Sequence, residues 1–257
     1  MVRAKKFLGQ HFLKDIDIAK RIVDSLVAPT GKMLEIGPGT GVLTQFLVER
    51  PEELKLVEID RESVPYLQQK FPAITPNLYQ DDFLEMDLNK LYSNNSFSII
   101  GNFPYNISSQ IFFKVIDHKE IIPEVVGMVQ KEVAERMVAS HGKKTYGILS
   151  VLLQRWYDIE YLFTVDENVF IPPPKVKSAV IKMTRNTRQD MQCNESLFIK
   201  LVKTTFNQRR KTIRNSIKPL LQDKIVEHEY MSLRPEQLSI QQFIELTNIL
   251  ESILEKG

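Results

Sequence analysis

The feature that most constrains the fold is a glycine-rich loop between a short apolar run and a segment of helical periodicity. Residues 32–37, KMLEIG, are typical of a buried strand, and the glycines of GPGTG then form a tight loop before VLTQFLVER, which has helical spacing. Further apolar runs at 54–60, 96–102 and 123–130 alternate with helical segments. Strands that alternate with helices predict right-handed crossovers and the mainly parallel sheet of an α/β protein.

The rest of the chain predicts a seven-stranded sheet followed by a small helical region. The remaining strands are expected at 74–82, in the second half of 148–165, and at 171–183. The segment TRNTRQDMQCNES is polar and aperiodic, and everything after it has the pattern of helices. We therefore expect an α/β domain over residues 1–183, a linker over 184–196, and an all-helical domain over 197–257.

Composition and charge narrow the class of protein. A single cysteine, Cys193, excludes an internal disulfide framework and a Cys-rich zinc site. The first 15 residues are basic but contain no long apolar run, so the sequence predicts neither a signal peptide nor a membrane span. These features predict a soluble protein of a reducing compartment, the cytoplasm, with no membrane partner. We also expect that it needs no metal and, as the simplest case, is a monomer.

The net charge of +2 is small, but the cations are unevenly distributed. The first six residues contain Arg3, Lys5 and Lys6 with no acid, and residues 203–218 contain six Lys or Arg, again with no acid. A nucleic-acid interface is therefore expected at these two segments and not over the whole surface.

The glycine loop predicts a ligand that carries no phosphate. Gly37, Gly39 and Gly41 allow close backbone approach, but the dinucleotide fingerprint requires a glycine where this chain has Val42. Pro38 also lacks an amide that would bind a pyrophosphate. A plain tight turn is the alternative interpretation of the glycines.

Two carboxylates extend this pattern. Glu58 ends the second strand 21 residues after Gly37, where a carboxylate can bind both ribose hydroxyls, and Asp82 follows the third strand, where it can bind an adenine amine. Each alone is equally typical of a solvated strand end. Together with the glycine loop they predict an adenosine pocket without a diphosphate, and hence S-adenosylmethionine as the cofactor.

The segment GNFPYN, at the end of the fourth strand, is an unusual strand exit. A simple turn would use Gly, Asp or Ser, whereas Asn102, Pro104 and Tyr105 supply an amide, a fixed φ and an aromatic ring. Such a loop is suited to a flat ligand that forms hydrogen bonds.

With these motifs, the chain resembles the ribosomal RNA adenine dimethyltransferase family. The resemblance covers nearly the whole chain and rests on KKFLGQHFL, LEIGPGTGVLT, VEID, GNFPYNIS, MVQKEVAERM, FIPPPKVKSAVIKM and FNQRRKTIRNSI. It implies a Rossmann-like class I methyltransferase fold. FNQRRKTIRNS is typical of the branch that acts during assembly of the small ribosomal subunit.

The resemblance also implies roles for individual residues. Cofactor contacts fall on His11, Leu13, Gly37, Gly39, Glu58, Asp82 and Asn102. The family usually has asparagine at the position of His11, and a mobile surface histidine is the alternative there. The catalytic residues are Asn102, Pro104, Tyr105 and Phe170. Tyr105 and Phe170 would enclose the target base, and an ordinary core aromatic before a proline turn is the alternative interpretation of Phe170.

The basic segment 201–221 predicts an RNA-binding helix. At 100° per residue its apolar side chains form one stripe, Val202, Phe206, Ile213, Ile217 and Leu220. The cations expected to bind phosphates are Lys203, Arg209, Arg210, Lys211, Arg214 and Lys218. An ordinary solvated helix face is the alternative, but such faces usually include acids as well.

By resemblance, the expected activity is dimethylation of two adjacent adenosines in the 3′-terminal hairpin of small-subunit (16S) ribosomal RNA, within the assembling 30S subunit. One alternative is an antibiotic-resistance methyltransferase that acts on large-subunit RNA. A second is an assembly or transcription factor that binds RNA without catalysis, although the intact Asn102, Pro104 and Tyr105 favour an enzyme. An NAD-dependent dehydrogenase is disfavoured by Val42.

Overall fold

The computed structural model describes residues 2–187, 192–221 and 224–255. The chain forms two compact units, Met1–Ala134 with Asp158–Arg185, and Glu135–Tyr157 with Asn186–Gly257. Residues 135–157, which the sequence analysis assigned to the α/β domain, therefore group with the C-terminal helices. Of the expected linker, residues 188–191 lie outside the described part of the chain.

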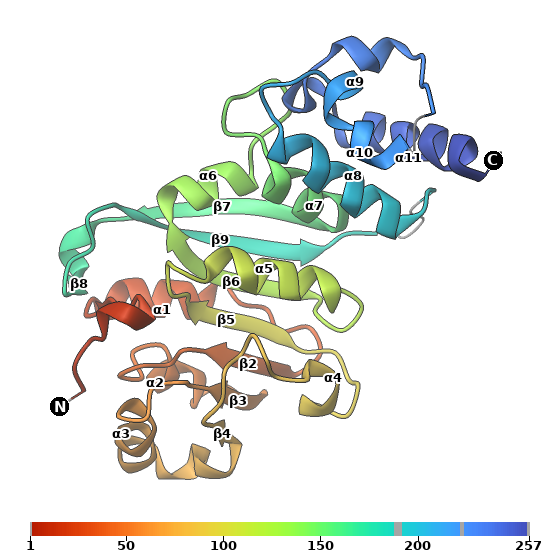
Figure 1. Ribbon diagram of the computed structural model, residues 1–257. Helices are drawn as coiled ribbons and strands as arrows, with labels where there is room; N and C mark the ends of the chain where they lie inside the picture. Colours follow the sequence, from red (N-terminus) through yellow and green to blue (C-terminus); the bar gives the residue numbers. More distant parts are fainter. Residues whose placement is uncertain (1, 188–191, 222–223, 256–257) are drawn as a thin grey trace. The chain divides into compact units, whose positions relative to one another are not determined.

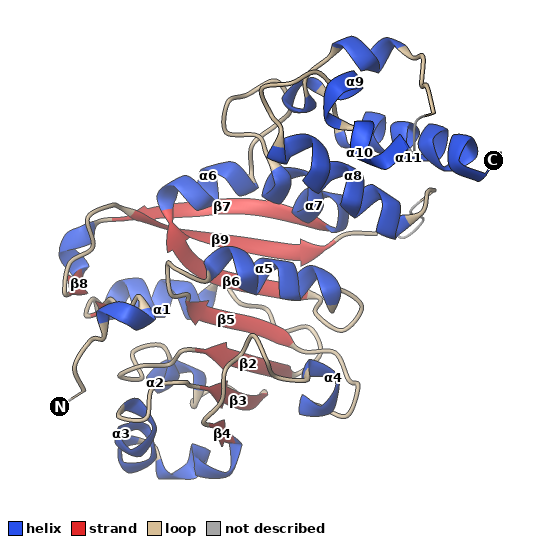
Figure 2. Ribbon diagram, in the orientation of Figure 1, coloured by secondary structure: helices blue, strands red, loops and turns tan. Residues whose placement is uncertain are grey.

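The first unit contains a seven-stranded, mainly parallel sheet, as predicted (Figures 1 and 2). In spatial order the strands are β4 (Leu78–Tyr79), β3 (Glu53–Val57), β2 (Lys32–Ile36), β5 (Ser98–Asn102), β6 (Glu124–Gln130), β9 (Ser178–Arg185) and β7 (Tyr157–Val165). The ladder from β4 to β6 is parallel, and β9 joins β6 antiparallel. Because Ile36 pairs with Val57 and Val57 with Tyr79, the carboxyl ends of three strands lie level at one edge.

Short helices connect these strands. They are α1 (Ile16–Asp24), α2 (Thr44–Leu47), α3 (Ser63–Lys70), α4 (Leu88–Leu91), α5 (Ser108–Asp117) and α6 (Lys131–Met137), whose last turn belongs to the second unit. The helix α1 begins at Ile16, because the Asp15 carboxylate at its N-cap accepts a hydrogen bond of 3.0 Å from the Ile18 amide.

A second, two-stranded ribbon was not predicted. The strand β1 (Phe12–Leu13) pairs antiparallel with β8 (Phe170–Ile171), so Leu13 lies opposite Phe170. The expected strand 171–183 is therefore divided, with the prolines between β8 and β9 outside both ladders. The ribbon joins the N-terminal segment to the loop before the last strand.

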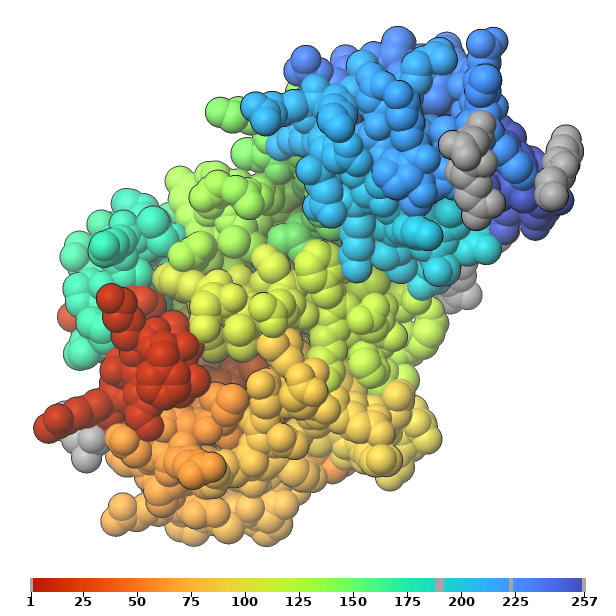
Figure 3. Space-filling view, in the orientation of Figure 1, coloured from red at the N-terminus to blue at the C-terminus, as the bar shows by residue number. Residues whose placement is uncertain are grey.

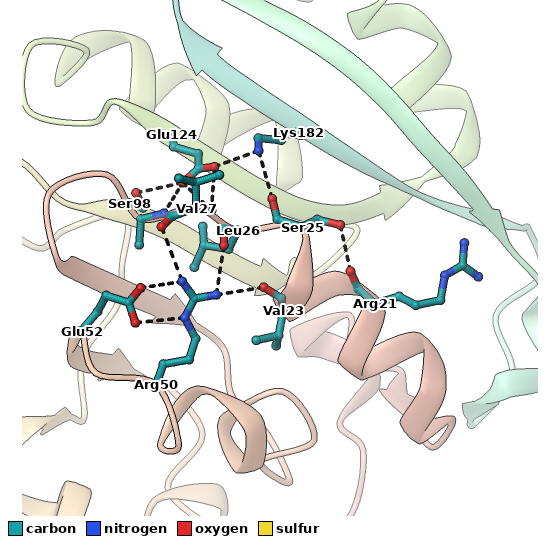
Figure 4. Close-up of polar contacts among 11 residues, drawn as sticks. Arg21, Val23, Ser25, Leu26, Val27, Arg50, Glu52, Ser98, Glu124 and Lys182 are labelled. Atoms are coloured by element: carbon teal, nitrogen blue, oxygen red, sulfur yellow. Dashed lines mark hydrogen bonds and ion pairs between the residues drawn. The ribbon is translucent and has the colours of Figure 1, made fainter.

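A buried carboxylate attaches the end of α1 to the amino ends of the central strands (Figure 4). Glu124, only 2% exposed, accepts hydrogen bonds from the Val27 and Ala28 amides at 3.0 and 2.8 Å and from the Ser98 hydroxyl at 3.2 Å. The Lys182 ammonium lies 3.2 Å from the same carboxylate. This cluster lies at the edge of the sheet opposite the carboxyl ends.

Arg50 also fixes the end of α1 and the turn that follows it (Figure 4). Its guanidinium donates to the carbonyl oxygens of Val23 and Leu26 at 3.2 and 2.9 Å, while Glu52 pairs with it at 2.6 Å. The free carbonyls at the end of α1 are thereby satisfied by a cation, which also complements the helix dipole.

The second unit is helical. It contains α7 (Ile148–Trp156), α8 (Glu195–Asn207), α9 (Ile213–Ser216), α10 (Lys218–Leu221) and α11 (Ile240–Glu255). Aromatic pairs build its core, with ring centroids 6.2 Å apart for Trp156 and Phe198 and 5.9 Å apart for Phe206 and Phe243.

The prediction of one continuous helix over 201–221 is wrong. The helix α8 ends at Asn207, and Gln208–Thr212 form a turn before α9. The turn allows the Ile213 amide to donate to the Leu233 carbonyl at 2.7 Å while Phe206 stays in the core. The apolar stripe is nevertheless buried, since all five of its predicted members are at most 9% exposed.

Within the described ranges, no helix is long and apolar enough to cross a membrane. The same residues contain no group of three or more His, Cys, Asp or Glu side chains arranged to hold a metal ion.

Candidate active site

The carboxyl ends of β2, β3 and β5 border a cavity of about 240 Å³ in the first unit. Eight of the predicted site residues line it: His11, Gly37, Gly39, Glu58, Asp82, Asn102, Pro104 and Tyr105. The remaining walls come from the N-terminal segment, from Ile59, and from the loop that contains Phe83. The cavity lies where parallel sheets bind ligands, at the carboxyl edge of the strands.

Glu58 holds the glycine loop as well as facing the cavity. Its carboxylate accepts hydrogen bonds from the Gly39 amide at 2.9 Å and from the Asp60 amide at 2.8 Å. The side chain is almost fully buried, and this burial raises the pKa of the Glu58 carboxyl. Each carboxylate oxygen retains a second lone pair, which is what a ribose diol requires.

The glycine loop leaves room for a ligand. Gly37 has φ +64°, and a Cβ built on it would meet no atom within 4 Å, so its open face adjoins the cavity. Gly39, at φ +57°, packs instead against the Phe12 ring, which would lie 2.9 Å from an added Cβ. Both glycines line the cavity, but Gly37 leaves space open for a ligand whereas Gly39 also allows the N-terminal segment to pack closely.

The turn that follows Asp82 fixes the orientation of its side chain. One carboxylate oxygen accepts a hydrogen bond of 2.9 Å from the Leu84 amide, and the Asp82 carbonyl accepts from Glu85 and Met86. The other carboxylate oxygen accepts no hydrogen bond from the described residues, so it is available to an amine donor of a ligand.

The charged residues that line the cavity distinguish between possible cofactors. Glu58, Asp81 and Asp82 line it, whereas no Lys or Arg does so among the residues that the structure describes. A diphosphate would meet uncompensated carboxylates in this cavity, but the sulfonium of S-adenosylmethionine carries a positive charge. The residues present fit S-adenosylmethionine, which supplies an electrophilic methyl group when bound.

Asn102 has a defined amide orientation. Its Nδ2 donates to the carbonyl oxygen of His11 at 2.9 Å. A carbonyl can only accept, so the opposite assignment of the amide is excluded, and the Asn102 Oδ1 remains an acceptor. The neighbouring Phe103 peptide is fixed as well, because its amide donates to Met128 O at 3.0 Å.

Tyr105 is held on two sides. Its ring stacks on the His11 imidazole, with centroids 5.3 Å apart and an interplanar angle of 29°. Its hydroxyl hydrogen-bonds to the hydroxyl of Ser178, a buried residue of β9. Burial raises the pKa of the Tyr105 phenol, so the ring is neutral at physiological pH.

His11 connects three parts of this site. Besides its stacking on Tyr105 and its carbonyl bond to Asn102, its Nδ1 lies 2.8 Å from the Pro172 carbonyl. Because that carbonyl is an acceptor, Nδ1 carries the proton. The prediction that His11 contacts the cofactor stays a prediction, since the ring lines the cavity but is engaged with protein groups.

The comparisons with known proteins agree with this geometry. Residues 1–253 match the family described as ribosomal RNA adenine dimethylase. The chain belongs to this family. The Ribosomal RNA small subunit methyltransferase A of Phocaeicola vulgatus is 58% identical over 258 residues, which cover 99% of this chain and 92% of that protein. The protein of the same name from Parabacteroides distasonis is 60% identical over 259 residues, covering 100% and 97%.

Solved structures show the same fold. A dimethyladenosine transferase from Plasmodium falciparum aligns with a TM-score of 0.78 at 24% identity, covering 96% of this chain and 98% of that one. The 23S rRNA methyltransferase ErmE aligns with a TM-score of 0.66 at 23% identity, covering 92% and 99%. The predicted Rossmann-like fold is confirmed, and S-adenosylmethionine-dependent methylation of adenine in ribosomal RNA is the activity of the family.

Two predicted site residues lie outside the cavity. Leu13 and Phe170 are 2% and 1% exposed, and both belong to the hydrophobic cluster behind the β1–β8 ribbon. Their backbone pairing fixes the direction of both side chains. The structure therefore places Phe170 as a core aromatic, and the predicted role of enclosing the target base does not correspond to this position.

The Asn102 loop is supported by buried packing that was not predicted from the sequence. Phe103 is 1% exposed, and its ring lies directly on Gly101 and Gly127. A Cβ on Gly127 would lie 2.3 Å from the Phe103 ring, and one on Gly101 would lie 2.8 Å from it. A glycine inside a strand signals such a close approach, so Gly127 in PEVVGMVQ was the available clue.

The predicted RNA-binding cations lie on the second unit. Lys203, Arg210, Lys211, Arg214 and Lys218 are exposed. Arg209 is half-buried, with its guanidinium 3.6 Å from the Glu236 carboxylate and 3.4 Å from the Lys143 carbonyl. Arg209 therefore has a structural partner, which the sequence did not reveal because Glu236 comes from a distant segment.

Proposed function

We propose that this protein transfers methyl groups from S-adenosylmethionine to the exocyclic amines of two adjacent adenosines in the 3′-terminal hairpin of small-subunit ribosomal RNA. The observation that carries the proposal is the fixed Asn102 amide beside Tyr105 at a carboxylate-lined cavity. The small-subunit substrate is supported by the names of the relatives at 58% and 60% identity.

The chemistry required is positioning of a weak nucleophile. The lone pair of an adenine amine is delocalised into the ring, so the amine attacks poorly. In our proposal Asn102 Oδ1 and the Phe103 carbonyl accept the two amine hydrogens, which draws the nitrogen towards tetrahedral geometry. Both acceptors belong to a peptide segment already fixed by His11 and Met128, so little reorganisation accompanies the reaction.

Tyr105 would stack on the extruded base. Its ring is preorganised by His11 and Ser178, and Pro104 restricts the backbone between it and Asn102. Stacking contributes about 1 to 3 kcal/mol per base, which offsets part of the cost of extrusion. The proton of the methylated amine can pass to water, so no protein base is needed.

In the cofactor half of the cavity, Glu58 would accept hydrogen bonds from the ribose hydroxyls and Asp82 one from the adenine amine. Leu13, which lies outside this cavity, would support the site only through packing. We propose further that the protein acts as a monomer in the cytoplasm, on the assembling small subunit, and that the exposed cations of the second unit contact RNA phosphates.

The decisive experiment is transfer of labelled methyl groups onto unmethylated small subunits, followed by nucleoside mass spectrometry. Dimethyladenosine in the 3′-terminal hairpin is the expected product. Transfer to large-subunit RNA instead would assign the protein to the resistance class, and absence of dimethyladenosine from both would contradict the proposal.

Catalysis is distinguished from a pure binding role by Tyr105→Ala. This variant should lose most methyl transfer, whereas a pure binding factor with the same change would keep its function in subunit assembly. If the wild type supports subunit assembly fully but transfers no methyl groups, the protein is a binding factor.

A further inference from the structure

The N-terminal turn exposes an aromatic side chain next to the cavity. Phe7 is 76% exposed, whereas its neighbour Leu8 lines the cavity. Both belong to the short 3₁₀ turn Lys6–Leu8, and Figure 3 shows the N-terminal segment, in red, on the surface. Single exposed apolar residues are common, so the meaning of Phe7 depends on its surroundings.

The turn is held in place by polar contacts. The Lys5 ammonium lies 2.5 Å from the Asp60 carboxylate and 3.2 Å from that of Glu62. The Lys5 amide donates to Gln10 Oε1 at 2.9 Å, and Gln10 Nε2 donates to Asp60 at 3.3 Å. Phe7 is thus presented by a fixed turn.

The same turn contacts the loop that carries Asn102 and Tyr105. Asn106 Nδ2 donates to the Phe7 carbonyl at 3.5 Å. Gly9, at φ +65°, lies so close to Asn106 that an added Cβ would be 2.4 Å from its Oδ1. The position of Phe7 is therefore set relative to the residues proposed to hold the target base.

The charges around Phe7 complement a polyanion. Lys5 is paired with two carboxylates, but Lys6 and Arg3 are exposed and form no ion pair with any residue in the described ranges. Two exposed cations within four residues of an exposed ring are a combination with which proteins bind single-stranded nucleic acid, through phosphates and base stacking.

We propose that Phe7 stacks on a nucleotide adjacent to the target adenosine, while Arg3 and Lys6 contact the neighbouring phosphates. An extruded adenosine leaves its neighbours partly unstacked, and an exposed ring on the turn that borders the cavity can cover one of them. This inference rests on the proposed function, because it requires that RNA enter this cavity.

The test compares Phe7→Ala, Phe7→Leu and Phe7→Trp with unmethylated small subunits as substrate. Loss of one stacking contact should raise the KM for subunits by about five-fold to about a hundred-fold in the Ala and Leu variants. The Trp variant should equal the wild type, and the dissociation constant for S-adenosylmethionine should not change in any of them. Val27→Ala, at a 62% exposed position beside the Glu124 cluster, is the matched control and should have no effect.

The results distinguish failure of the stacking role from failure of the proposed enzymatic function. A wild type without methyl transfer would refute the proposed function, whereas an active Ala variant with an unchanged KM would refute the stacking role alone. Full recovery by Leu would indicate an apolar contact with a protein surface and would also overturn the inference. Weakened cofactor binding in the Ala variant would show that Phe7 acts on the cavity and not on RNA.

Discussion

At the scale of single residues, the least expected feature of the site is the position of the His11 ring. It stacks on Tyr105 and donates to Pro172, so its contacts are with the catalytic loop and the β8 loop. Sequence resemblance alone suggested a cofactor contact, because the family has a polar asparagine at this position. The structure offers a second role, in which the imidazole supports the tyrosine.

We expect His11→Asn to lower kcat by about two-fold to about ten-fold, because Tyr105 loses a stacking partner that contributes about 0.5 to 1.5 kcal/mol. His11→Phe, which retains an aromatic ring, should stay close to the wild type. Single-turnover rates with saturating small subunits provide the measurement, and calorimetric titration of S-adenosylmethionine is the control. A lower cofactor affinity with an unchanged rate would favour the contact with the cofactor.

Glu35 is a second residue whose environment has a measurable consequence. It is 1% exposed on β2, accepts a hydrogen bond of 2.7 Å from the Thr44 hydroxyl, and its burial raises the pKa from 4.5 to about 8. A carboxyl with a raised folded-state pKa binds its proton more tightly in the folded protein. The free energy of unfolding should therefore fall as pH rises from about 5 to about 8.

Glu35→Gln tests this linkage, because glutamine can accept the same hydrogen bond and cannot ionise. The variant should gain stability relative to the wild type between pH 5 and pH 8, by about 3 to 5 kcal/mol as an order of magnitude. Urea unfolding at several pH values measures the difference. Parallel pH dependence of the two proteins would contradict the assigned protonation.

At the scale of elements, the Asn102 loop depends on close packing between β5 and β6. Gly101 pairs with Gly127 across these strands, and the Phe103 ring occupies the space that two Cβ atoms would take. Phe103 cannot retreat easily, because Phe112 of α5 packs edge-on against it with centroids 5.9 Å apart. Gly101 and Gly127 thus allow the Phe103 ring to pack directly on β5 and β6, and this packing positions the catalytic loop.

Gly127→Ala should lower the free energy of unfolding by about 1 to 3 kcal/mol, as overpacking in a filled core does. It should also lower kcat, because a displaced Phe103 moves its own carbonyl and Asn102. Denaturant unfolding and methyl transfer are measured together, with Gly147→Ala as the control, since a Cβ there meets no atom within 4 Å. A stable Gly127→Ala enzyme with normal kcat would show that the loop tolerates the shift.

The features of this protein that could be predicted from its sequence are those that local interactions determine. The strands, the glycine loop and the Asn102 turn were predictable because periodicity and turn chemistry act over a few residues. The β1–β8 ribbon, the burial of Phe170 and the Arg209–Glu236 pair were not, because each joins segments far apart in the chain. The break after Asn207 was missed for the same reason, since a contact with Leu233 decides it.

At the scale of the whole molecule, the chemistry and the phosphate contacts proposed for the cations of residues 203–218 belong to different units. The cavity is built from residues of the first unit, and the exposed cations Arg210, Lys211 and Arg214 belong to the second. A division of this kind lets affinity for RNA be altered without a change in the site. Phosphate contacts would position the substrate, and access to the cavity would select the adenosine.

Replacing Arg210, Lys211 and Arg214 by glutamine should weaken binding to small subunits and reduce the salt dependence of binding by about one unit of slope for each lost phosphate contact. Arg209 is left intact because it pairs with Glu236, and its loss would confound folding with binding. Binding is measured over a range of salt concentrations, and the affinity for S-adenosylmethionine is the control. An unchanged slope would mean that these three cations face solvent in the complex, and the phosphate contacts would then have to be sought elsewhere, first at Arg3 and Lys6.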